Sequence, residues 1–377
     1  MRKGPNSAAA LLVGIWLLAA CSAEQTTAST TADRQGVLSG VCPSTVVIQA
    51  DWEPEAEHGG VYHLLGDKYE IDERTKSVTG PLLAAGQDTG VDAQIRIGGS
   101  AVGYQSAHSL LYQDPEILIG FGRVTEYMVA LKDTPVVSIM ALLEKSPYAI
   151  FWDPKTYPEV QAIADLKAKN VVIEMGSENA VWQEYLLGKG LVTESQADRS
   201  VPQPGAFVAA GGKEAQAGFI TSEPYMYEHE MPQWGRPVKG QLLHDVGYPE
   251  YFQSLVVRKA DVTEQAGCLS KLIPIIQRSL KDYVQNSEKT NALIVELVDT
   301  YDTGWIYTAG RAKASIDEQI KLGLVSNGDD KILGNFDMNR VQELIGIVGT
   351  YTKTDVSGVQ PADLVTNEFI DESIGVD

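Results

Sequence analysis

The stretch DWEPEAEHGG, residues 51–60, places a tryptophan, three glutamates, a histidine and a glycine pair directly after the apolar alternating run TVVIQA. The indole of Trp52 offers a flat apolar face on which a heteroaromatic ring can stack. Gly59 and Gly60 lack a β-carbon, so they allow a ligand to approach the backbone closely. We therefore predict that Trp52 and His58 form half of a binding site for a flat ring. The alternatives are a core position for Trp52 and a helix cap for His58.

Three acidic residues, Glu53, Glu55 and Glu57, alternate through the same stretch. Acidic side chains in the first turn of a helix interact favourably with the helix dipole. We expect at least two of the three to be structural residues at the surface. Whether any of them touches a ligand is left open.

Further candidate residues follow other predicted strands. In EMGSENAV, Gly176 allows close approach and Ser177 is expected to cap a helix whose first amides point into a cleft. SEPYMYE supplies Glu223 and Tyr225, and DVGYPEY supplies Tyr248. A carboxylate among aromatic side chains suits a neutral ring bearing N–H donors, as an aminopyrimidine does. The alternative for the tyrosines is packing at a hinge.

The elements that would position these residues alternate along the chain. Short β-branched runs such as EILIGFG and NVVIEMG are each followed by a helical pattern, which predicts parallel sheets with helices on both faces. In such sheets ligands bind at the carboxyl ends of strands. Helices predominate in the C-terminal third, where CLSKLIPIIQRSLKDYV carries one apolar stripe and Pro274 should kink the helix or mark its start.

The first residues have the layout of an export signal. Arg2 and Lys3 precede the apolar stretch AAALLVGIWLLAA, which is too short for a comfortable membrane span. The tetrapeptide LAAC that follows resembles the lipobox of bacterial lipoproteins, which implies a signal peptide at 1–20 and a lipid on Cys21. An ordinary signal peptide with a chance cysteine is the alternative. The Ser, Thr and Ala-rich residues 21–42 then form a predicted flexible tether.

Charge and cysteine content narrow the function classes. The formal charge is −20, and without residues 1–20 it becomes −22, which argues against a nucleic-acid partner.

Cys42 and Cys268 are expected to form a disulfide, with two free buried thiols as the alternative. The sequence has no Gly-x-Ser-x-Gly or His-Glu-x-x-His motif, and YEHE at 227–230 is better explained as an acidic helix face than as a metal site.

Four segments together carry a resemblance to a known family: DWEPEAEHGG, KSPYAIFWDP, IADLKAKNVVIEMGSENAVWQEYL and AGFITSEPYMYE. They resemble the extracytoplasmic solute-binding lipoproteins of ABC importers. The Trp-x-Pro-x-x-x-His run at Trp52, Pro54 and His58 points to the branch of thiamine-pyrimidine synthase and of the pyrimidine-precursor, riboflavin, sulfonate and nitrate binding proteins.

The resemblance implies an α/β, two-lobed periplasmic-binding-protein-like fold of type II, in which two crossover strands form the hinge. Lobe one would comprise 43–145 plus 244–377, and lobe two 146–243. Trp52, His58 and Gly59 of lobe one would then face Gly176, Ser177, Glu223 and Tyr225 of lobe two across a ligand cleft, with Tyr248 beside it just after the second crossover.

The implied function is capture of a small solute for an ABC permease and ATPase by an extracytoplasmic, monomeric protein anchored to the cell membrane through Cys21, with no cofactor and no metal. Eukaryotic relatives in this branch are synthases with a cysteine-rich, iron-associated stretch that this sequence lacks. A non-iron synthase-like enzyme therefore stays only an alternative.

The solute itself is predicted from the charges expected at the cleft. Small oxyanions predict basic or amide-rich clefts, and Arg123, with acids around it, is the only arginine near a strand end that we expect at the mouth. This disfavours sulfonate and nitrate. A heteroaromatic solute remains, with a thiamine pyrimidine precursor first and a flavin such as riboflavin second.

Overall fold

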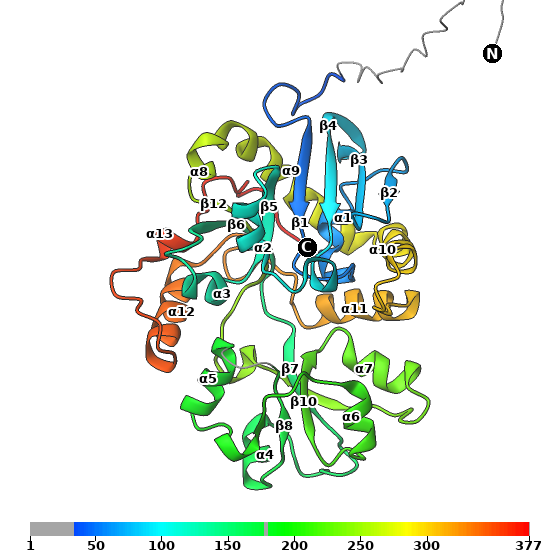
Figure 1. Ribbon diagram of the computed structural model, residues 1–377, viewed down its shortest axis with the longest axis vertical. Helices are drawn as coiled ribbons and strands as arrows, with labels where there is room; N and C mark the ends of the chain where they lie inside the picture. Colours follow the sequence, from blue (N-terminus) through cyan, green and yellow to red (C-terminus); the bar gives the residue numbers. More distant parts are fainter. Residues whose placement is uncertain (1–33, 177–179, 377) are drawn as a thin grey trace, which may run out of the picture. The chain divides into compact units, whose positions relative to one another are not determined.

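The computed structural model describes residues 34–176 and 180–376, which form two β-sheets covered by helices (Figure 1). The larger sheet, called the large sheet, has seven strands. In spatial order they are β2 (Glu70–Asp72), β3 (Ser77–Ala84), β4 (Gln87–Arg96), β1 (Thr45–Gln49), β5 (Ile117–Gly122), β12 (Phe252–Arg258) and β6 (Val136–Leu143).

The second sheet, called the small sheet, has five strands, all within the range expected for lobe two. In spatial order they are β11 (Lys239–Leu242), β7 (Tyr148–Trp152), β10 (Ala215–Phe219), β8 (Ile173–Glu174) and β9 (Ala197–Asp198). The predicted α/β class is thus confirmed.

The strand directions differ from the all-parallel prediction, because both sheets are mixed. β1 runs parallel to β4 and β5, whereas β12 runs antiparallel to β5 and β6. In the small sheet β7 runs antiparallel to both of its neighbours. The hairpins β2–β3 and β3–β4 were not predicted; Ala85 and Gly86 turn the second one with φ of 47° and 76°, as a tight two-residue turn requires.

Helices cover both faces of the large sheet, as predicted. Val46 and Ile48 of β1 belong to the same apolar core as the buried stripe of α9, whereas Val47 faces the other way and packs in the core that contains Leu111 of α2. This alternation is the period of a strand that is buried on both faces.

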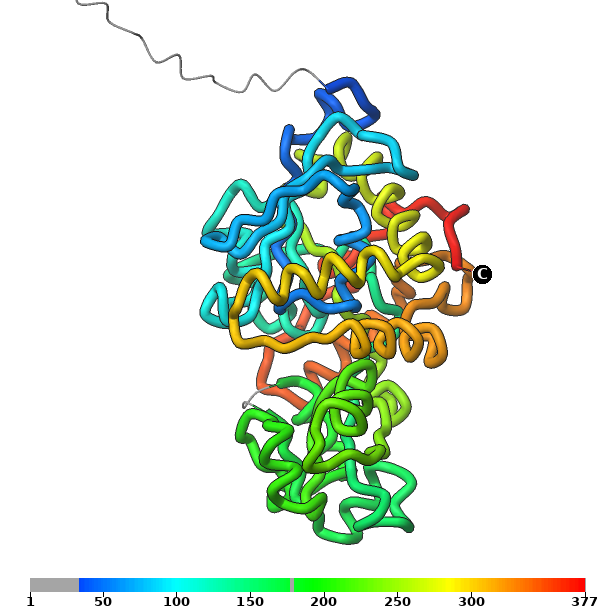
Figure 2. Tube along the Cα trace, turned by 90° about the vertical axis from the view of Figure 1, so that its right-hand side faces the viewer, coloured from blue at the N-terminus to red at the C-terminus, as the bar shows by residue number. Residues whose placement is uncertain are grey.

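The helices are short in the first two thirds of the chain and long in the last third. They are α1 (Gly59–Tyr62), α2 (Ala107–Gln113), α3 (Val124–Val129), α4 (Ile163–Ala168), α5 (Val181–Gly188), α6 (Pro204–Ala209), α7 (Glu223–Tyr225), α8 (Asp261–Glu264), α9 (Ala266–Gln285), α10 (Glu288–Tyr301), α11 (Ala309–Lys321), α12 (Met338–Tyr351) and α13 (Pro361–Leu364). Pro274 lies inside α9 and does not mark its start. α10 and α11 run side by side (Figure 2).

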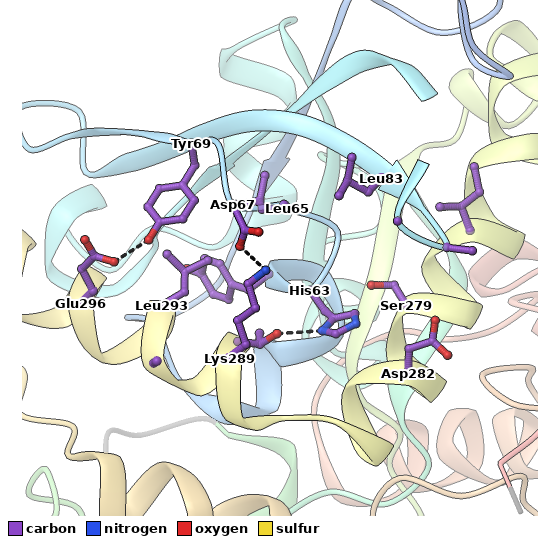
Figure 3. A pocket seen from close by; sticks show the side chains of 17 residues that line it. His63, Leu65, Asp67, Tyr69, Leu83, Ser279, Asp282, Lys289, Leu293 and Glu296 are labelled. Atoms are coloured by element: carbon purple, nitrogen blue, oxygen red, sulfur yellow. Dashed lines mark hydrogen bonds and ion pairs between the residues drawn. The ribbon is translucent and has the colours of Figure 1, made fainter. Parts of the chain in front are cut away.

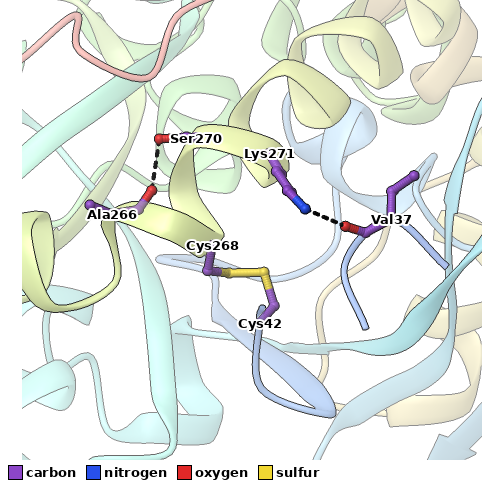
Figure 4. Close-up of a disulfide and its surroundings, with 6 residues drawn as sticks. All are labelled: Val37, Cys42, Ala266, Cys268, Ser270 and Lys271. Atoms are coloured by element: carbon purple, nitrogen blue, oxygen red, sulfur yellow. Dashed lines mark hydrogen bonds between the residues drawn. A yellow bond between two sulfur atoms is a disulfide. The ribbon is translucent and has the colours of Figure 1, made fainter. Parts of the chain in front are cut away.

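The segment before β1 is part of the fold, although residues up to 42 were expected to be a flexible tether. Leu38 is fully buried, and its amide donates to the carbonyl of Thr89. Cys42 and Cys268 are joined by a disulfide near the start of α9 (Figure 4). Lys271 Nζ also donates to the Val37 carbonyl, at 3.2 Å. The packed part of the chain therefore begins by residue 38. Cys21 lies outside the described residues.

Two connecting segments, 144–147 and 243–251, join the sheets, and Arg340 of α12 binds both. Its guanidinium donates to Glu144 Oε1 and the Glu144 carbonyl, each at 2.5 Å, and to the carbonyls of Pro249 and Glu250, at 2.7 and 3.3 Å. The Ser146 amide also donates to the Glu250 carbonyl, at 3.2 Å. These bonds hold the two segments against each other.

Within the described residues, no helix has both the length and the hydropathy that crossing a membrane requires.

We predict that Arg340→Met lowers the free energy of unfolding by about 3–5 kcal/mol, because it leaves the buried Glu144 carboxylate without its partner. Urea denaturation followed by circular dichroism measures the loss. The double variant Arg340→Met/Glu144→Gln should recover part of that stability. A double variant no more stable than Arg340→Met would contradict this account.

Candidate functional site

The chain that follows β1 turns into the protein interior and places His58 there. His58 is fully buried, and its Nε2 lies 3.2 Å from Asp51 Oδ1. Its ring meets Phe121 edge-on, with centroids 5.0 Å apart. No side-chain cap hydrogen bond is formed at the start of α1, so the helix-cap alternative has no support. His58 is instead an interior imidazole held by a carboxylate.

The three glutamates of the same stretch are buried, so the expectation of surface residues was wrong. Glu53, Glu55 and Glu57 are only 3%, 4% and 2% exposed. Glu53 accepts hydrogen bonds from Ser100 Oγ at 2.7 Å and Thr303 Oγ1 at 3.0 Å. The chain enters a short 3₁₀ helix at Ala56, and these carboxylates point into neighbouring loops instead of solvent.

Glu57 connects the large-sheet part of the chain to the small sheet. Its Oε1 accepts hydrogen bonds from Thr221 Oγ1, just after β10, and from Ser315 Oγ of α11 at 3.1 Å. The segments that follow β1 and β10 are therefore in contact.

Two carboxyl groups near this contact, those of Glu55 and Glu223, have raised pKa values. Burial raises the pKa of Glu55 well above its usual range, and the charges of Glu57, Asp51 and Glu223 raise it further. Its Oε1 is buried without a hydrogen-bond partner, 3.6 Å from His58 Nε2. Burial also raises the pKa of Glu223 to about 7, although its carboxylate accepts from the Phe219 amide at 2.8 Å. We call Asp51, Glu55, Glu57, His58 and Glu223 the acidic cluster.

Both arginines near the acidic cluster already have carboxylate partners. Arg123 Nε donates to Glu126 at 3.1 Å. Burial opposes the charge of Arg123, but the neighbouring acids, led by Glu126, raise its pKa well above the usual value. Arg311 of α11 is paired with Glu230, so the YEHE segment is a contact between the two parts of the chain and not simply an acidic face. Among the described residues, no group of His, Cys, Asp and Glu could hold a metal ion.

Three aromatic rings from three strands gather beside Arg123, and the sequence analysis did not single them out. Tyr148 opposes Phe219 across the β7–β10 pair, with ring centroids 4.8 Å apart and nearly perpendicular. Phe252, at the start of β12, lies 5.7 Å from Tyr148 and 5.4 Å from Phe219. The guanidinium of Arg123 lies over Tyr148 and Phe252, at 5.9 and 5.8 Å. In the sequence these residues are marked only by their positions: Tyr148 and Phe252 begin β7 and β12, and Phe219 ends β10.

Trp52 belongs to a different aromatic group from His58. It is half-buried, with Tyr104 at 5.9 Å and Trp305 at 6.0 Å between ring centroids. Tyr104 is 71% exposed. Trp305 stacks on Tyr307, whose hydroxyl accepts from the Ala56 amide at 3.1 Å. Trp52 is therefore not a core residue, and its aromatic group adjoins the acidic cluster through Tyr307.

Gly59 and Gly60 permit a close approach, but of a helix and not of a ligand. A β-carbon on Gly59 would lie 2.0 Å from the Tyr283 ring, and one on Gly60 would lie 2.8 Å from Leu280. Both neighbours belong to α9. The glycines therefore let α1 pack directly on α9, and the ligand role expected for Gly59 is replaced by a packing role.

The remaining candidates are spread over the small sheet and the connecting segments. Gly176 lies two residues after β8, with φ of 90°, and its amide donates to the Ser200 carbonyl. Ser177 lies outside the described residues. Tyr225 packs against Gly310 of α11, where a β-carbon would lie 1.9 Å from its hydroxyl.

Tyr248 has the hinge-packing role that was its alternative. It is buried at 1% exposure and donates to Thr125 Oγ1 at 3.1 Å. Thr125 in turn donates from its amide to the buried Glu250 carboxylate, at 3.2 Å.

Comparison with known proteins agrees with this architecture. Residues 122–290, less than half of the chain, match the family model described as NMT1/THI5 like. No curated protein matches the chain in sequence. Among solved structures, the periplasmic aliphatic sulphonate binding protein of Escherichia coli is similar, with TM-score 0.53 and 10% identity over 88% of this chain and 92% of that one.

Two further structures resemble the chain to a similar degree. A putative sulfonate-binding protein of an ABC transporter from Methylobacillus flagellatus gives TM-score 0.52 and 12% identity over 86% of this chain and 92% of that one. The ligand-binding component of an ABC-type import system from Staphylococcus aureus gives 0.51 and 10% over 88% and 97%. At such identities the likeness is one of fold. Together with the family match, it confirms the periplasmic-binding-protein-like fold and the resemblance to this branch.

The raised pKa of Glu223 predicts that stability falls as pH rises. The folded protein keeps the Glu223 proton up to about pH 7, whereas the unfolded chain releases it near 4.5. The stability from neutral Glu223 is fully present below the lower value and is lost as pH rises through the higher one. Between about pH 5 and 8, the melting temperature of Glu223→Gln should therefore fall less than that of the wild type. Glu228→Gln, an exposed change in the neighbouring turn, is the control, and equal slopes for Glu223→Gln and wild type would contradict the prediction.

Proposed function

We propose that the protein is the extracytoplasmic solute-binding component of an ABC import system, and that it captures a small heteroaromatic solute with N–H donors. A thiamine pyrimidine precursor is the first candidate. The fold and the family match support the transport role, since the similar structures are described as ligand-binding components of importers. The acidic cluster supports the type of solute.

The observation that carries the solute class is the unpartnered carboxyl of Glu55. A buried polar atom without a partner costs about 1–3 kcal/mol, so a group that supplies the partner gains binding energy there. A neutral carboxylic acid has one O–H donor beside one acceptor oxygen. An aminopyrimidine offers the complement, an amino donor beside a ring nitrogen acceptor. Glu55, whose pKa burial raises, is suited to this two-point contact.

The same charges argue against an oxyanion. Sulfonate or nitrate binding is favoured by unpaired cations, and the guanidinium groups of Arg123 and Arg311 are paired with Glu126 and Glu230. An anion would also face the carboxyl groups of the acidic cluster. We therefore infer that the solute differs from those named for the sulfonate-binding neighbours.

Aromatic residues on two sides of the acidic cluster provide faces for a flat ring. Tyr148 and Phe219 are only partly buried, and we propose that one of them contacts the ring of the solute. Trp52 is the proposed outer stacking residue, and His58 acts from behind by holding Asp51 and Glu55 in place. Roles for Gly176, Ser177, Tyr225 and Tyr248 in ligand contact remain part of the hypothesis.

The partners follow from the transport role. The N-terminal signal and LAAC support attachment to the cell membrane by a lipid on Cys21. A permease and an ATPase subunit would then receive the solute from a monomeric binding protein.

We predict that the hydroxymethyl aminopyrimidine precursor of thiamine binds the protein in calorimetric titration, and that methanesulfonate does not. Glu55→Leu should weaken binding by about ten-fold or more, at about 1.4 kcal/mol per decade, because the paired donor and acceptor are lost. Glu55→Gln keeps a donor beside an acceptor and should retain most of the affinity.

Three outcomes test the ligand prediction further. Trp52→Ala should weaken binding without changing the apo melting curve, because the indole is half-exposed. Equal affinity for wild type and Glu55→Leu would remove the basis for the solute class. Mass spectrometry of the molecule released on denaturation identifies the natural solute, and a chemically altered one would favour the enzyme alternative.

The lipid anchor gives a second prediction. Cys21→Ser should convert a membrane-associated protein into a soluble exported one, because no thiol remains to carry the lipid. Cell fractionation and immunoblotting measure the change, and Cys42→Ser is the control for loss of a cysteine elsewhere. A Cys21→Ser protein that stays in the membrane fraction would show that LAAC is not a lipidation signal.

A further inference from the structure

A separate cavity of about 410 Å³ lies among α1, the β2–β3 region and the helices α9 and α10 (Figure 3). Its lining includes no member of the acidic cluster. The volume is within the range of small-molecule sites in proteins. It is therefore large enough for a ligand of its own.

One wall of the cavity is apolar and comes from four aliphatic side chains. Leu65, Ile275 and Leu293 are 7–8% exposed, and Leu83 is half-buried. They belong to three different parts of the fold: the turn after α1, β3, and helices α9 and α10. Such a wall gains free energy by covering the apolar body of a ligand.

Most polar side chains of the cavity are already paired; the Tyr62 hydroxyl, which is buried without a hydrogen-bond partner, and the Asp282 carboxylate are exceptions. Lys289 forms an ion pair with Asp67 at the exposed rim, and the Tyr69 hydroxyl donates to Glu296 at 2.6 Å. Asp282 of α9 has no hydrogen-bond or ion-pair partner for its carboxylate among the described residues.

His63 stands beside this carboxylate without neutralising it. Its Nδ1 lies 2.7 Å from Thr290 Oγ1, and Figure 3 shows His63 on the side of the cavity that holds Ser279 and Asp282. Burial lowers the pKa of His63 in spite of the Asp282 charge, so the imidazole is neutral near pH 7. A neutral imidazole does not compete with a cationic ligand for Asp282. The three carboxylates of the lining outnumber its single lysine.

We propose that this cavity binds a small organic amine with an apolar body. The ammonium group pairs with Asp282, and the apolar body lies against the leucine and isoleucine wall. An anionic ligand would find the only lysine of the lining already paired with Asp67. The cavity is thus a second ligand site, and it does not depend on the proposed transport function.

The test uses n-hexylamine, with n-hexanol and hexanoate as neutral and anionic probes of matched length. In calorimetric titration and thermal shift of the full exported protein, the amine should bind at least about ten-fold more tightly than either matched probe. Asp282→Asn should lose that preference. Ala292→Trp places a large side chain at the exposed edge of the cavity and should block all binding there. Asp299→Asn, an exposed change on α10 outside the lining, should bind the amine as wild type does.

Glu55→Leu separates this site from the acidic cluster. Amine binding that survives Glu55→Leu and is lost in Asp282→Asn supports the proposal, whatever the fate of the pyrimidine. Amine binding that is lost in Glu55→Leu and kept in Asp282→Asn would overturn it. Equal binding of the three probes, or no binding of the amine, would overturn it as well.

Discussion

The arrangement of the two sheets depends on one arginine. Arg340 makes four hydrogen bonds to the two connecting segments and lies 3.7 Å over the Tyr251 ring, while only 13% of its side chain is exposed. Burial raises the pKa of its partner Glu144 to about 7, even though Arg340 acts in the opposite direction. The hydrogen bonds and the ring contact of Arg340 therefore matter as much as its charge interaction with Glu144. The connecting segments set where the small sheet begins, and Glu57 meets Thr221 across the two parts of the chain.

Burial of the acidic cluster lowers the stability of the folded protein unless its carboxyl groups are protonated or hydrogen-bonded. Burying several carboxyl groups together destabilises the charged forms, and the fold accommodates this partly by keeping protons on Glu55 and Glu223. Glu57 takes the other route and accepts hydrogen bonds from Thr221 and Ser315. Burial raises the pKa of Glu55, and a protonated carboxyl group without a partner favours a ligand that offers both a donor and an acceptor.

Much of the fold and part of the site could be predicted from the sequence. β-branched runs followed by helical patterns indicate α/β layers, and the ends of those runs gave His58 and Glu223, which the structure brings to one cluster. The pairing of Cys42 with Cys268 could be predicted because the third cysteine, Cys21, was assigned to a predicted lipid site. These inferences rest on local patterns or on counting, and both are visible in one sequence.

What could not be predicted depends on contacts between distant segments. The dipole argument placed Glu53, Glu55 and Glu57 at the surface because it considers only the helix they precede, and not the loops at 100, 221 and 303 that cover them. The glycine pair at 59 and 60 shows that something approaches closely, but not that it is Tyr283 and Leu280 of α9. Arg311 and Glu230 carry no local signal at all. The β2–β3 hairpin was missed because β2 has only three residues and β3 contains Gly80 and Pro81, which are rare inside strands.

The disulfide between Cys42 and Cys268 has a mechanical consequence. Cys42 precedes β1, which lies between β4 and β5 in the interior of the large sheet. A pull along the chain from its N-terminal side reaches the disulfide before it reaches β1. The covalent bond passes the load to α9, a twenty-residue helix packed along the core, so β1 and the segment that leads from it to His58 are shielded from the pull. A force applied from the N-terminal side therefore leaves the geometry around His58 unchanged.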